Sequence, residues 1–319
     1  MDESIKDSKA QIIFVVGPTA TGKSDLSILL AEHFKAEIIN ADSIQFYNQI
    51  EIGTAKPSKD MLERVPHHLI SFVEPPHTLS AGDFSRAAEK LITERRASGV
   101  NKFVLVGGSG FYIQALEKGM VPAPQIDDAT RAQVQQQFES QGSVKLWKEI
   151  EKFDPEYAQK ISPNDSYRVQ RALEILLSSP KTISAAQHEF ESQGSSFKKN
   201  FHIHKLALDI DRDELRLRVG LRTEQMLRAN WIEEVQELRA LGFSGWAPLS
   251  SVGYFEIGEF LDAKISKADL KGRIMTSTMQ LAKKQRTWFR RDQEIHWLNN
   301  VTADSKLFFQ NALKHLAIG

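Results

Sequence analysis

The sequence predicts an α/β protein in which helices flank a parallel β-sheet and an all-helical insertion domain interrupts the chain. Short apolar runs alternate with helical patterns through the first third of the sequence, and this alternation is typical of a doubly wound sheet. A long polar segment without a good strand follows, and one further strand comes after it. We therefore expect a first core part at 1–125, a helical insertion at 126–200 and the completion of the core at 201–319.

The first core part is expected to hold four strands and two helices. The apolar runs that we interpret as strands are Ile12–Val16, Glu37–Asn40, His68–Val73 and Phe103–Val106. One helix is expected at Lys23–Phe34 and another at 80–96, because both segments are amphipathic at helical spacing. Ser80 and Asp83 have the spacing of a capping box, with aspartate in place of the usual glutamate.

The rest of the chain is expected to be mainly helical. Two prolines within 121–128 end the alternating pattern, and the glutamine-rich segment that follows shows helical periodicity only. A strand at Lys205–Asp209 resumes the core, and the last third is helical again.

The bulk composition excludes several classes of function. The chain has 319 residues with 41 basic and 41 acidic side chains, so any nucleic-acid surface must be local. It has no cysteine, which excludes disulfides, cysteine zinc sites and thiol catalysis. The polar N-terminus lacks a signal-peptide core, and no apolar run approaches the roughly 20 residues of a membrane span. We expect a cytoplasmic protein without a membrane partner, and a monomer.

The segment IIFVVGPTATGKS at 12–24 predicts a phosphate-binding loop. It fits the P-loop pattern G-x-x-x-x-G-K-[ST] between a strand and a helix, so we expect a P-loop NTPase-like sheet. Backbone N–H groups, the helix N-terminus and Lys23 supply positive charge, and Ser24 can ligate Mg²⁺. ATP is only the commonest ligand of such a loop. The residues expected to bind a di- or triphosphate are Gly17, Pro18, Thr19, Ala20, Thr21, Gly22, Lys23 and Ser24.

The segment KGRIMTSTMQLAKKQRTWFRR at 271–291 predicts a basic helix. It carries seven basic residues and no acidic one. Ile274, Leu281 and Trp288 recur at i, i+7 and i+14, which indicates a buried stripe, and the basic side chains gather on another side. Such a face suits contact with phosphates, although a merely solvated charged face is the commoner explanation.

Several longer motifs give the sequence a family resemblance. The segment NADSIQFYNQIEIGTAKP at 40–57 follows the second strand, and Asp42 lies where a P-loop protein places a base or a magnesium ligand. It is followed in order by PHHLI, LVGGSGFYIQAL, NDSYRVQRALEI, VGYFEI and QLAKKQRTWFRRD. Together these motifs resemble the tRNA dimethylallyltransferases (tRNA isopentenyltransferases, bacterial type) from residue 12 to about 297.

The resemblance implies transfer of a dimethylallyl group from dimethylallyl pyrophosphate to N6 of adenosine 37 of tRNA, 3′ of the anticodon. In that reading the P-loop holds the pyrophosphate of the donor, with Mg²⁺ as cofactor. It further implies that Arg222 reaches the same phosphates and that Thr19 lies near the bridging oxygen of the leaving group. Asp42 is implied as the base that takes the N6 proton, and a role as an outer Mg²⁺ ligand stays open beside it.

The resemblance also implies an RNA-binding set that recognises the anticodon stem-loop. Gln45 and its neighbours are placed to read a base swung out of the loop. The positions that match RNA contacts of the family are Asp42, Ser43, Ile44, Gln45, Ser109, Arg131, Tyr167, Arg168, Val169, Gln170, Arg171, Lys283, Lys284 and Arg286.

A few positions depart from the family pattern. Ser109 and Phe111 stand where threonine and leucine are usual in the glycine turn. Asn230 and Trp231 replace a common glycine and leucine, and Phe255 replaces a common lysine. The departures leave the phosphate residues unchanged but put RNA contacts near 253–256 in doubt.

Three rival functions remain open from the sequence. A small-molecule P-loop kinase would use ATP, with Arg168 or Arg171 as a lid arginine. An adenylate isopentenyltransferase would prenylate free AMP or ATP, and a non-catalytic P-loop module would only bind RNA.

Zinc at His67 and His68 is disfavoured because no third ligand has suitable spacing. The tryptophans at 231, 246, 288 and 297 are expected to pack rather than to stack on bases.

Overall fold

The computed structural model describes residues 9–122, 124–299 and 305–316. The polar N-terminal segment 1–8, used above for the expected localisation, lies outside the described residues. The chain forms two compact units. We call Met1–Glu117 with Phe197–Gly319 the core unit, and Lys118–Ser196 the helical unit.

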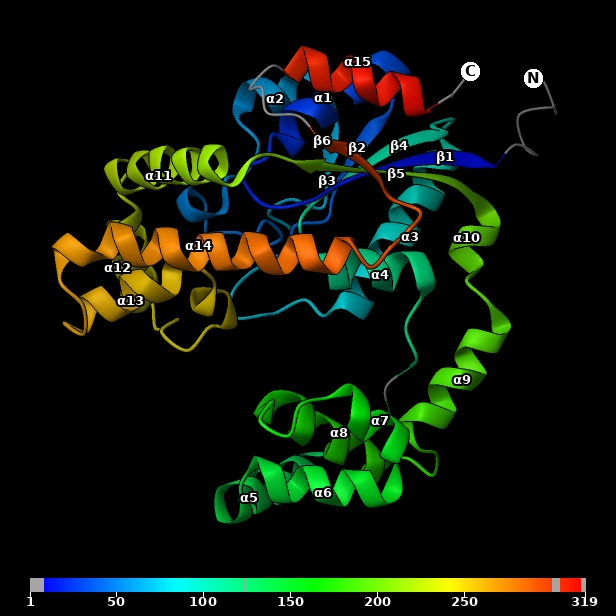
Figure 1. Cartoon of the computed structure of the whole chain (residues 1–319), viewed down its shortest axis with the longest axis vertical. Helices are drawn as coiled ribbons and strands as arrows, with labels where there is room; N and C mark the ends of the chain where they lie inside the picture. Colours follow the sequence, from blue (N-terminus) through cyan, green and yellow to red (C-terminus); the bar gives the residue numbers. More distant parts are fainter. Residues whose placement is uncertain (1–8, 123, 300–304, 317–319) are drawn as a thin grey trace. The chain divides into compact units, whose positions relative to one another are not determined.

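The core unit is built on one parallel sheet (Figure 1). The strands are β1 (Ala10–Val16), β2 (Glu37–Asn40), β3 (His67–His68), β4 (Lys102–Val106), β5 (Phe201–Asp209) and β6 (His296–Asn299). Their order across the sheet is β3-β2-β4-β1-β5-β6. The parallel, helix-flanked sheet predicted from the sequence is therefore confirmed, and the carboxyl ends of β1, β2, β4 and β5 meet at one edge, where ligands bind in such folds.

Helices connect and cover these strands. In the core unit they are α1 (Lys23–Phe34), α2 (Lys59–Arg64), α3 (Ala81–Ala97), α4 (Gly110–Lys118), α10 (Ser196–Asn200), α11 (Arg212–Arg228), α12 (Trp231–Ala240), α13 (Tyr254–Leu261), α14 (Lys267–Phe289) and α15 (Ser305–Leu316). Two short 3₁₀ turns are η2 (Ile52–Thr54) and η3 (Ala247–Ser250). The expected capping box of α3 is confirmed, because Ser80 and Asp83 bond each other's backbone N–H groups.

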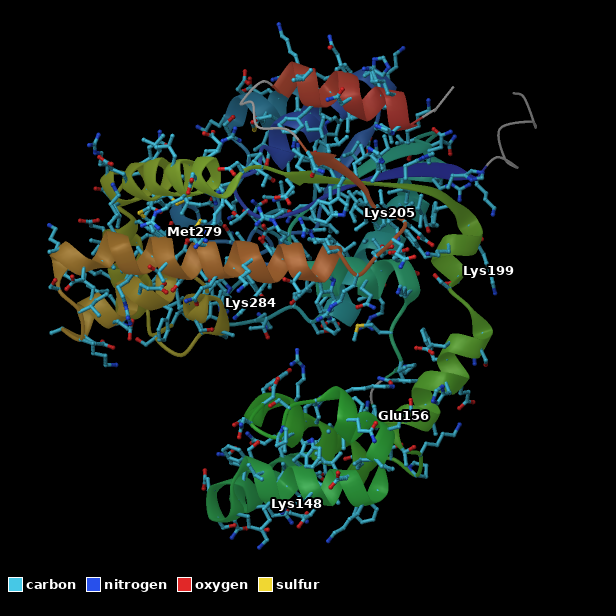
Figure 2. The ribbon with its side chains drawn as sticks, viewed as in Figure 1. Lys148, Glu156, Lys199, Lys205, Met279 and Lys284 are labelled. Carbon is cyan, nitrogen blue, oxygen red and sulfur yellow. The ribbon has the colours of Figure 1, made fainter. Side chains whose placement is uncertain are left out.

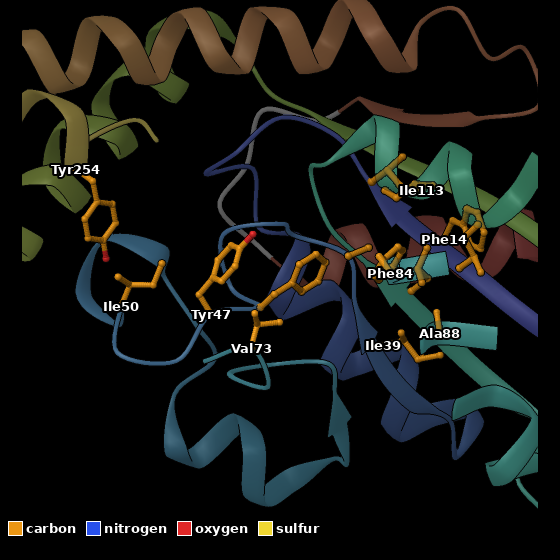
Figure 3. Close-up of a cluster of buried hydrophobic side chains, with 14 of the residues drawn as sticks. Phe14, Ile39, Tyr47, Ile50, Val73, Phe84, Ala88, Ile113 and Tyr254 are labelled. Atoms are coloured by element: carbon orange, nitrogen blue, oxygen red, sulfur yellow. The ribbon is translucent and has the colours of Figure 1, made fainter. Parts of the chain in front are cut away.

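Two apolar layers hold the sheet, one on each face. On one face α1 and α15 pack against side chains such as Val15 and Val104. On the other face α3 and α4 pack on β1 and β2, where Phe84 and Ile113 meet Phe14 (Figure 3). The second layer continues through Tyr47, Ile50 and Val73 to Tyr254 of α13, so the loops after β2 are anchored in the core.

Strands β1 and β4 begin two residues and one residue earlier than expected, and three further strands differ more from the sequence expectation. The strand expected at His68–Val73 is only β3, because Leu69 and Ser71 adopt positive φ and turn the chain out of the sheet. Strand β5 starts at Phe201, before the expected Lys205–Asp209. Strand β6 was not expected, since its HWLN sequence alternates too weakly to stand out and its edge position leaves it partly exposed.

The helical unit has a core of its own. It contains α5 (Asp128–Gln141), α6 (Ser143–Phe153), α7 (Pro155–Lys160), α8 (Ser166–Ser178) and α9 (Ile183–Gln193). Val134, Leu146 and Ile150 are fully buried there. The buried Asp154 accepts hydrogen bonds from the Ser184 N–H and hydroxyl at 2.8 and 2.6 Å, which ties the start of α7 to α9.

In the described part of the chain, none of the helices has the length and hydropathy that a membrane crossing requires.

Candidate active site

The glycine loop between β1 and α1 has the strained backbone that a phosphate cradle requires. Gly17 has φ +125°, and a Cβ there would lie 2.6 Å from the Leu208 carbonyl oxygen, so no side chain fits. Gly22 caps α1 in the left-handed region at φ 94°. The Pro18 carbonyl accepts from Thr21 Oγ1 at 2.9 Å and from Lys23 Nζ at 2.6 Å. The loop therefore closes on itself and directs the N-terminus of α1 toward the sheet edge.

A cavity of about 410 Å³ opens directly above this loop. Its wall contains residues 19–25, together with Asn40 and Asp42 after β2, whereas the predicted Gly17 and Pro18 do not line it. Helix α11 closes the other side with Arg218, Arg222 and Gln225. The cavity thus combines an α-helix N-terminus with side chains of both charge signs, and its basic members suit an anion.

Asp42 is held at the end of β2 by local hydrogen bonds. Its N–H donates to Asn40 Oδ1 at 3.0 Å, and Asn40 Nδ2 donates to the Leu69 carbonyl at 3.0 Å. Burial raises the pKa of Asp42, while the positive charges of Lys23 and Arg222 oppose this rise. A carboxylate with a raised pKa is a stronger base, so the arrangement suits proton abstraction.

The two cations beside Asp42 are also perturbed. The pKa of Lys23 is lowered to about 8, mainly by burial. The negative charge of Asp42 opposes this shift, and the positive charge of Arg222 adds to it. Burial lowers the pKa of Arg222, against the pull of Asp42. Arg222 Nη1 lies 3.5 Å from Thr19 Oγ1, which brings the guanidinium to the loop. Two cations thus face one carboxylate. A bound anion would therefore stabilise the charged forms of Lys23 and Arg222.

A second cavity, of about 380 Å³, meets the first at this same cluster. Thr19, Asp42 and Arg222 line both cavities. The rest of the second cavity is more apolar and includes Ile44, Val219, Met226, Trp231, Val252, Ile274 and Leu281. The cavity above the glycine loop, which suits a phosphate, therefore shares one wall with a more apolar cavity. A reaction between a ligand in one cavity and a ligand in the other would occur at that wall.

Sequence reasoning missed Gln285, which links the loop to α14. Its Oε1 accepts from the Thr19 N–H at 2.8 Å, and its Nε2 donates to the Gly108 carbonyl at 3.1 Å. The signal in the sequence was a polar residue between Leu281 and Trp288, at helical spacing from both, on the side of α14 expected to be buried. Gln285 fixes the backbone of Thr19 relative to the turn after β4.

Several residues that we expect to contact RNA also make bonds within the protein. Ser109 Oγ accepts from the Ser43 N–H at 2.9 Å and donates to Ser43 Oγ at 3.0 Å. Gln45 Nε2 donates to the carbonyls of Thr54 and Ala55 at 3.1 and 3.0 Å. Ile44 packs against the core. These bonds shape the loop after β2. Because they use the side-chain nitrogen of Gln45, the side-chain oxygen is the atom of this residue that can accept a hydrogen bond from a ligand.

The basic helix is α14, and its outer face is narrower than expected. Lys283 and Lys284 are exposed, the second of them labelled in Figure 2. Arg286 corrects the expectation of an outward side chain: it is half-buried, and its Nε donates to Asp209 Oδ1 at 2.9 Å. The strand-end carboxylate captures this guanidinium because both lie at the carboxyl edge of the sheet. Of the expected stripe, Ile274 is buried, whereas Leu281 and Trp288 are half-buried.

The remaining RNA candidates lie in the helical unit. Tyr167 is 78% exposed, Arg131 and Arg168 are exposed, and Gln170 and Arg171 are half-buried. The three arginines pair with carboxylates of their own segments, namely Asp128, Asp165 and Glu174. Val169 corrects the expectation of an RNA contact through its side chain, which is fully buried in the core of this unit.

The sequence departures have structural explanations. Asn230 adopts φ 69° at the start of α12, a left-handed conformation that asparagine tolerates nearly as readily as the usual glycine. Trp231 is buried, and a Cβ on Gly53 or Gly253 would lie 2.3 or 2.0 Å from its ring. Trp246 is buried as expected. Phe255 is 51% exposed.

Neither the histidines nor the carboxylate cluster of the core unit resembles a metal site. His67 Nδ1 lies 2.7 Å from the Val65 carbonyl, and His68 Nε2 lies 2.8 Å from Glu37 Oε2. Glu117, Asp292 and Glu294 form a carboxylate cluster, but the Lys205 ammonium lies at its centre, 2.5 to 2.8 Å from an oxygen of each. Because that ammonium already supplies the positive charge, the cluster is an ion-pair network.

Comparisons with known proteins identify relatives along most of the chain. The family model described as IPP transferase matches residues 45–292. A tRNA dimethylallyltransferase of Bdellovibrio bacteriovorus is 44% identical, over 92% of this chain and 95% of that protein. One from Geobacter sulfurreducens is 36% identical, over 91% of this chain and 92% of that protein.

Two solved structures are also similar. A tRNA isopentenylpyrophosphate transferase from Bacillus halodurans has a TM-score of 0.71 at 29% identity, over 97% of this chain and 96% of that one. A eukaryotic dimethylallyltransferase acting on tRNA has a TM-score of 0.80 at 27% identity, over 96% and 77%.

Proposed function

This chain belongs to the IPP transferase family, and from that premise we propose that it transfers a dimethylallyl group from dimethylallyl pyrophosphate to N6 of adenosine 37 in tRNA. Its activity is tRNA isopentenylation, so a small-molecule kinase and an adenylate isopentenyltransferase are not favoured. The observation that carries the assignment of roles is the wall shared by the two cavities, where Thr19, Asp42 and Arg222 meet.

The pyrophosphate of the donor is assigned to the cavity above the glycine loop. The loop amides, Lys23 and Arg222 supply fixed positive charge there. As the allylic C–O bond breaks, its electron pair moves to the leaving pyrophosphate, and preorganised positive charge stabilises this change. Thr19 Oγ1, near Arg222, is placed to donate a hydrogen bond to the bridging oxygen.

The adenine is assigned to the second cavity, on the other side of the shared wall. The N6 lone pair attacks the allylic carbon, and the N6 proton must leave as the new C–N bond forms. Asp42 has the position and the raised pKa to accept this proton. The apolar side chains of this cavity suit both a base and a five-carbon allyl group.

The residues around the loop fit Mg²⁺ as the cofactor. The Ser24 hydroxyl and the carboxylates of Asp25 and Asp42 line the same cavity, and hard oxygen donors of this kind, together with phosphate oxygens, are the usual Mg²⁺ ligands. When bound, the ion would neutralise part of the pyrophosphate charge. Ser24 is the protein ligand that we assign to it, and Asp42 is at most an outer ligand.

RNA binding is assigned to both units, in a monomeric protein of the cytoplasm. The helical unit, in the segment expected at 126–200, offers Arg131, Tyr167, Arg168 and Arg171 on its surface. Helix α14 offers Lys283 and Lys284. Contacts of this kind give salt-dependent affinity for the phosphates of an anticodon stem-loop.

The decisive test is transfer of label from radiolabelled dimethylallyl pyrophosphate to unmodified tRNA with Mg²⁺, using the wild-type chain and Asp42→Asn. We expect label in wild-type tRNA without ATP, and a loss of roughly 10²–10⁴-fold in kcat for Asp42→Asn, the usual contribution of a general base. The variant should still bind tRNA. Loss of tRNA binding with normal turnover per bound tRNA would refute the role of Asp42.

Label in free AMP instead of tRNA, or consumption of ATP without prenyl transfer, would refute the proposed substrate.

A further inference from the structure

We propose that Phe111 is a stacking platform for an unpaired base next to the target adenosine in the RNA loop. The inference rests on the proposed function and extends it to a residue with no role in that proposal. Phe111 lies in the first turn of α4, and 53% of its surface is exposed. An exposed phenyl ring contributes little to the core, so the exposed part of the Phe111 ring is available for contact with a ligand.

The turn that precedes Phe111 borders the second cavity and packs against α14. The turn before Phe111 lies directly on this helix, because a Cβ on Gly108 would be 2.3 Å from Gln285 Nε2 and one on Gly110 would be 2.2 Å from the Trp288 ring. Ser109 and Gln285 line the second cavity. Trp288 follows Gln285 by three residues, so it lies about one helical turn beyond the cavity wall.

Trp288 fixes the orientation of the Phe111 ring. The two rings make an edge-to-face contact, with centroids 6.4 Å apart and planes at 85°. Such contacts are favourable and directional, so this contact restrains the phenylalanine ring while 53% of the residue stays exposed to solvent. A fixed and open aromatic ring is the geometry on which a nucleic-acid base stacks.

The charges around the ring favour a nucleic acid over an apolar partner. Lys284 and Trp288 occur at i and i+4, which places them on one face of α14, and Arg291 follows shortly after the end of this helix. The Arg291 guanidinium lies 5.8 Å from the centre of the Trp288 ring. No acidic residue occurs within 271–291. Cations beside exposed aromatics bind single strands, with phosphates on the cations and bases on the rings.

The chain offers both a conservative variant and a matched control. Phe111→Leu introduces leucine, which is the usual residue at this position of the glycine turn. The variant keeps an apolar side chain and removes only the aromatic ring. Phe111→Tyr keeps the aromatic face. Phe255, at 51% exposure on α13, is a comparably exposed phenylalanine without a ring contact in the described part of the chain, and Phe255→Leu is the control.

The experiment measures prenyl transfer to an unmodified anticodon stem-loop and to copies with a single abasic sugar on either side of the target. Base–aromatic stacking corresponds to roughly 5- to 150-fold in affinity. For Phe111→Leu we expect a KM for the RNA about tenfold higher, at the lower end of this range because leucine keeps some contact, with kcat unchanged. Phe111→Tyr should restore the wild-type KM, and Phe255→Leu should not change it. On the RNA that lacks the stacked base, wild type and Phe111→Leu should have the same KM.

A fluorescent base adds a direct readout. With 2-aminopurine at the stacked position, binding to wild type should quench its emission, and Phe111→Leu should quench it less. The proposal is overturned if Phe111→Leu keeps the wild-type KM, if it lowers kcat alone, or if Phe255→Leu has the same effect. Absence of transfer by the wild-type chain would instead refute the proposed function.

Discussion

At the residue scale, the proposed mechanism requires an unprotonated carboxylate on Asp42 and a protonated ammonium on Lys23. Burial raises the pKa of Asp42 and lowers that of Lys23 to about 8, so the two shifts narrow the pH range in which both groups carry charge. Both shifts arise because the groups lie in an enclosed cavity, and the charges on Lys23 and Asp42 partly offset them.

This predicts a bell-shaped pH dependence of kcat/KM. Asp42 accepts a proton only above its raised pKa, and Lys23 is charged only below its lowered one, so the alkaline limb should fall near pH 8 in the free enzyme. Lys23→Arg should lower the rate but remove this limb, because a guanidinium keeps its charge. An unchanged alkaline limb in Lys23→Arg would assign it to another group. The measurement is kcat/KM for dimethylallyl pyrophosphate from pH 5 to 10.

Gln285 is predicted to act by positioning the backbone of Thr19. Gln285→Leu removes the bonds to the Thr19 N–H and to the Gly108 carbonyl. We expect kcat to fall roughly ten- to a hundredfold, since displacements of about 1 Å at a reacting centre have effects of this size. The KM for RNA should change little. Gln280→Leu, on an exposed position of the same helix, is the control, and an equal loss there would contradict the role of Gln285.

At the element scale, one buried lysine joins segments that are distant in sequence. Lys205 of β5 contacts Glu117 at the end of α4, and Asp292 and Glu294 between α14 and β6. Burial alone would lower the pKa of Lys205, but the hydrogen bonds that its ammonium donates to the three carboxylates raise this pKa instead. The bonds from Lys198 and Lys205 lower the pKa of Glu294 to about 2. Lys205 and Glu294 therefore stay charged at neutral pH.

Removing the central charge should destabilise the core unit. Lys205→Met leaves Glu117, whose side chain is 4% exposed, with Lys198 as its remaining cation. We expect the free energy of unfolding to fall by roughly 3 kcal/mol, the lower end of the range for broken buried pairs. Lys205→Met with Glu117→Leu should recover most of it. Lys264→Met, in an exposed pair with Asp262, should cost at most about 1 kcal/mol by urea unfolding, and an equal cost at both sites would contradict the prediction.

At the scale of the whole molecule, the core unit and the helical unit have separate apolar cores. Val134, Leu146 and Ile150 belong to the helical unit only, while the two layers around the sheet belong to the core unit. Units with separate cores can lose structure independently. The wall of Thr19, Asp42 and Arg222 that the two cavities share lies entirely in the core unit.

A cavity in one unit should therefore leave the other protected. Leu146→Ala is expected to cost roughly 2–5 kcal/mol within the helical unit, because it removes a fully buried side chain. Hydrogen exchange should become faster in α5, α6 and α8 and stay slow in β1 and β4. Leu26→Ala in α1 should give the opposite pattern. Faster exchange throughout the chain after either change would show that the units unfold together.

The sequence by itself determined most of the sheet and the position of the glycine loop. Strand β2 and helix α1 have the bounds that the periodicity predicted, and the glycine loop lies between β1 and α1 as expected. These features depend on neighbours in sequence: alternating burial, backbone strain at glycine, and the start of a helix. The signal for β3 and β6 was weak, because two residues at positive φ shorten one and edge exposure obscures the other.

Only the tertiary structure decided which side chains are free to act. Ser109 bonds Ser43, Arg286 pairs with Asp209, and Gln285 holds Thr19, and each of these contacts joins segments far apart in the chain. A sequence shows that a side chain is basic or polar but not which partner from another strand will meet it. The exposure of Phe111 is decided in the same way, because it depends on how α14 packs against the glycine turn.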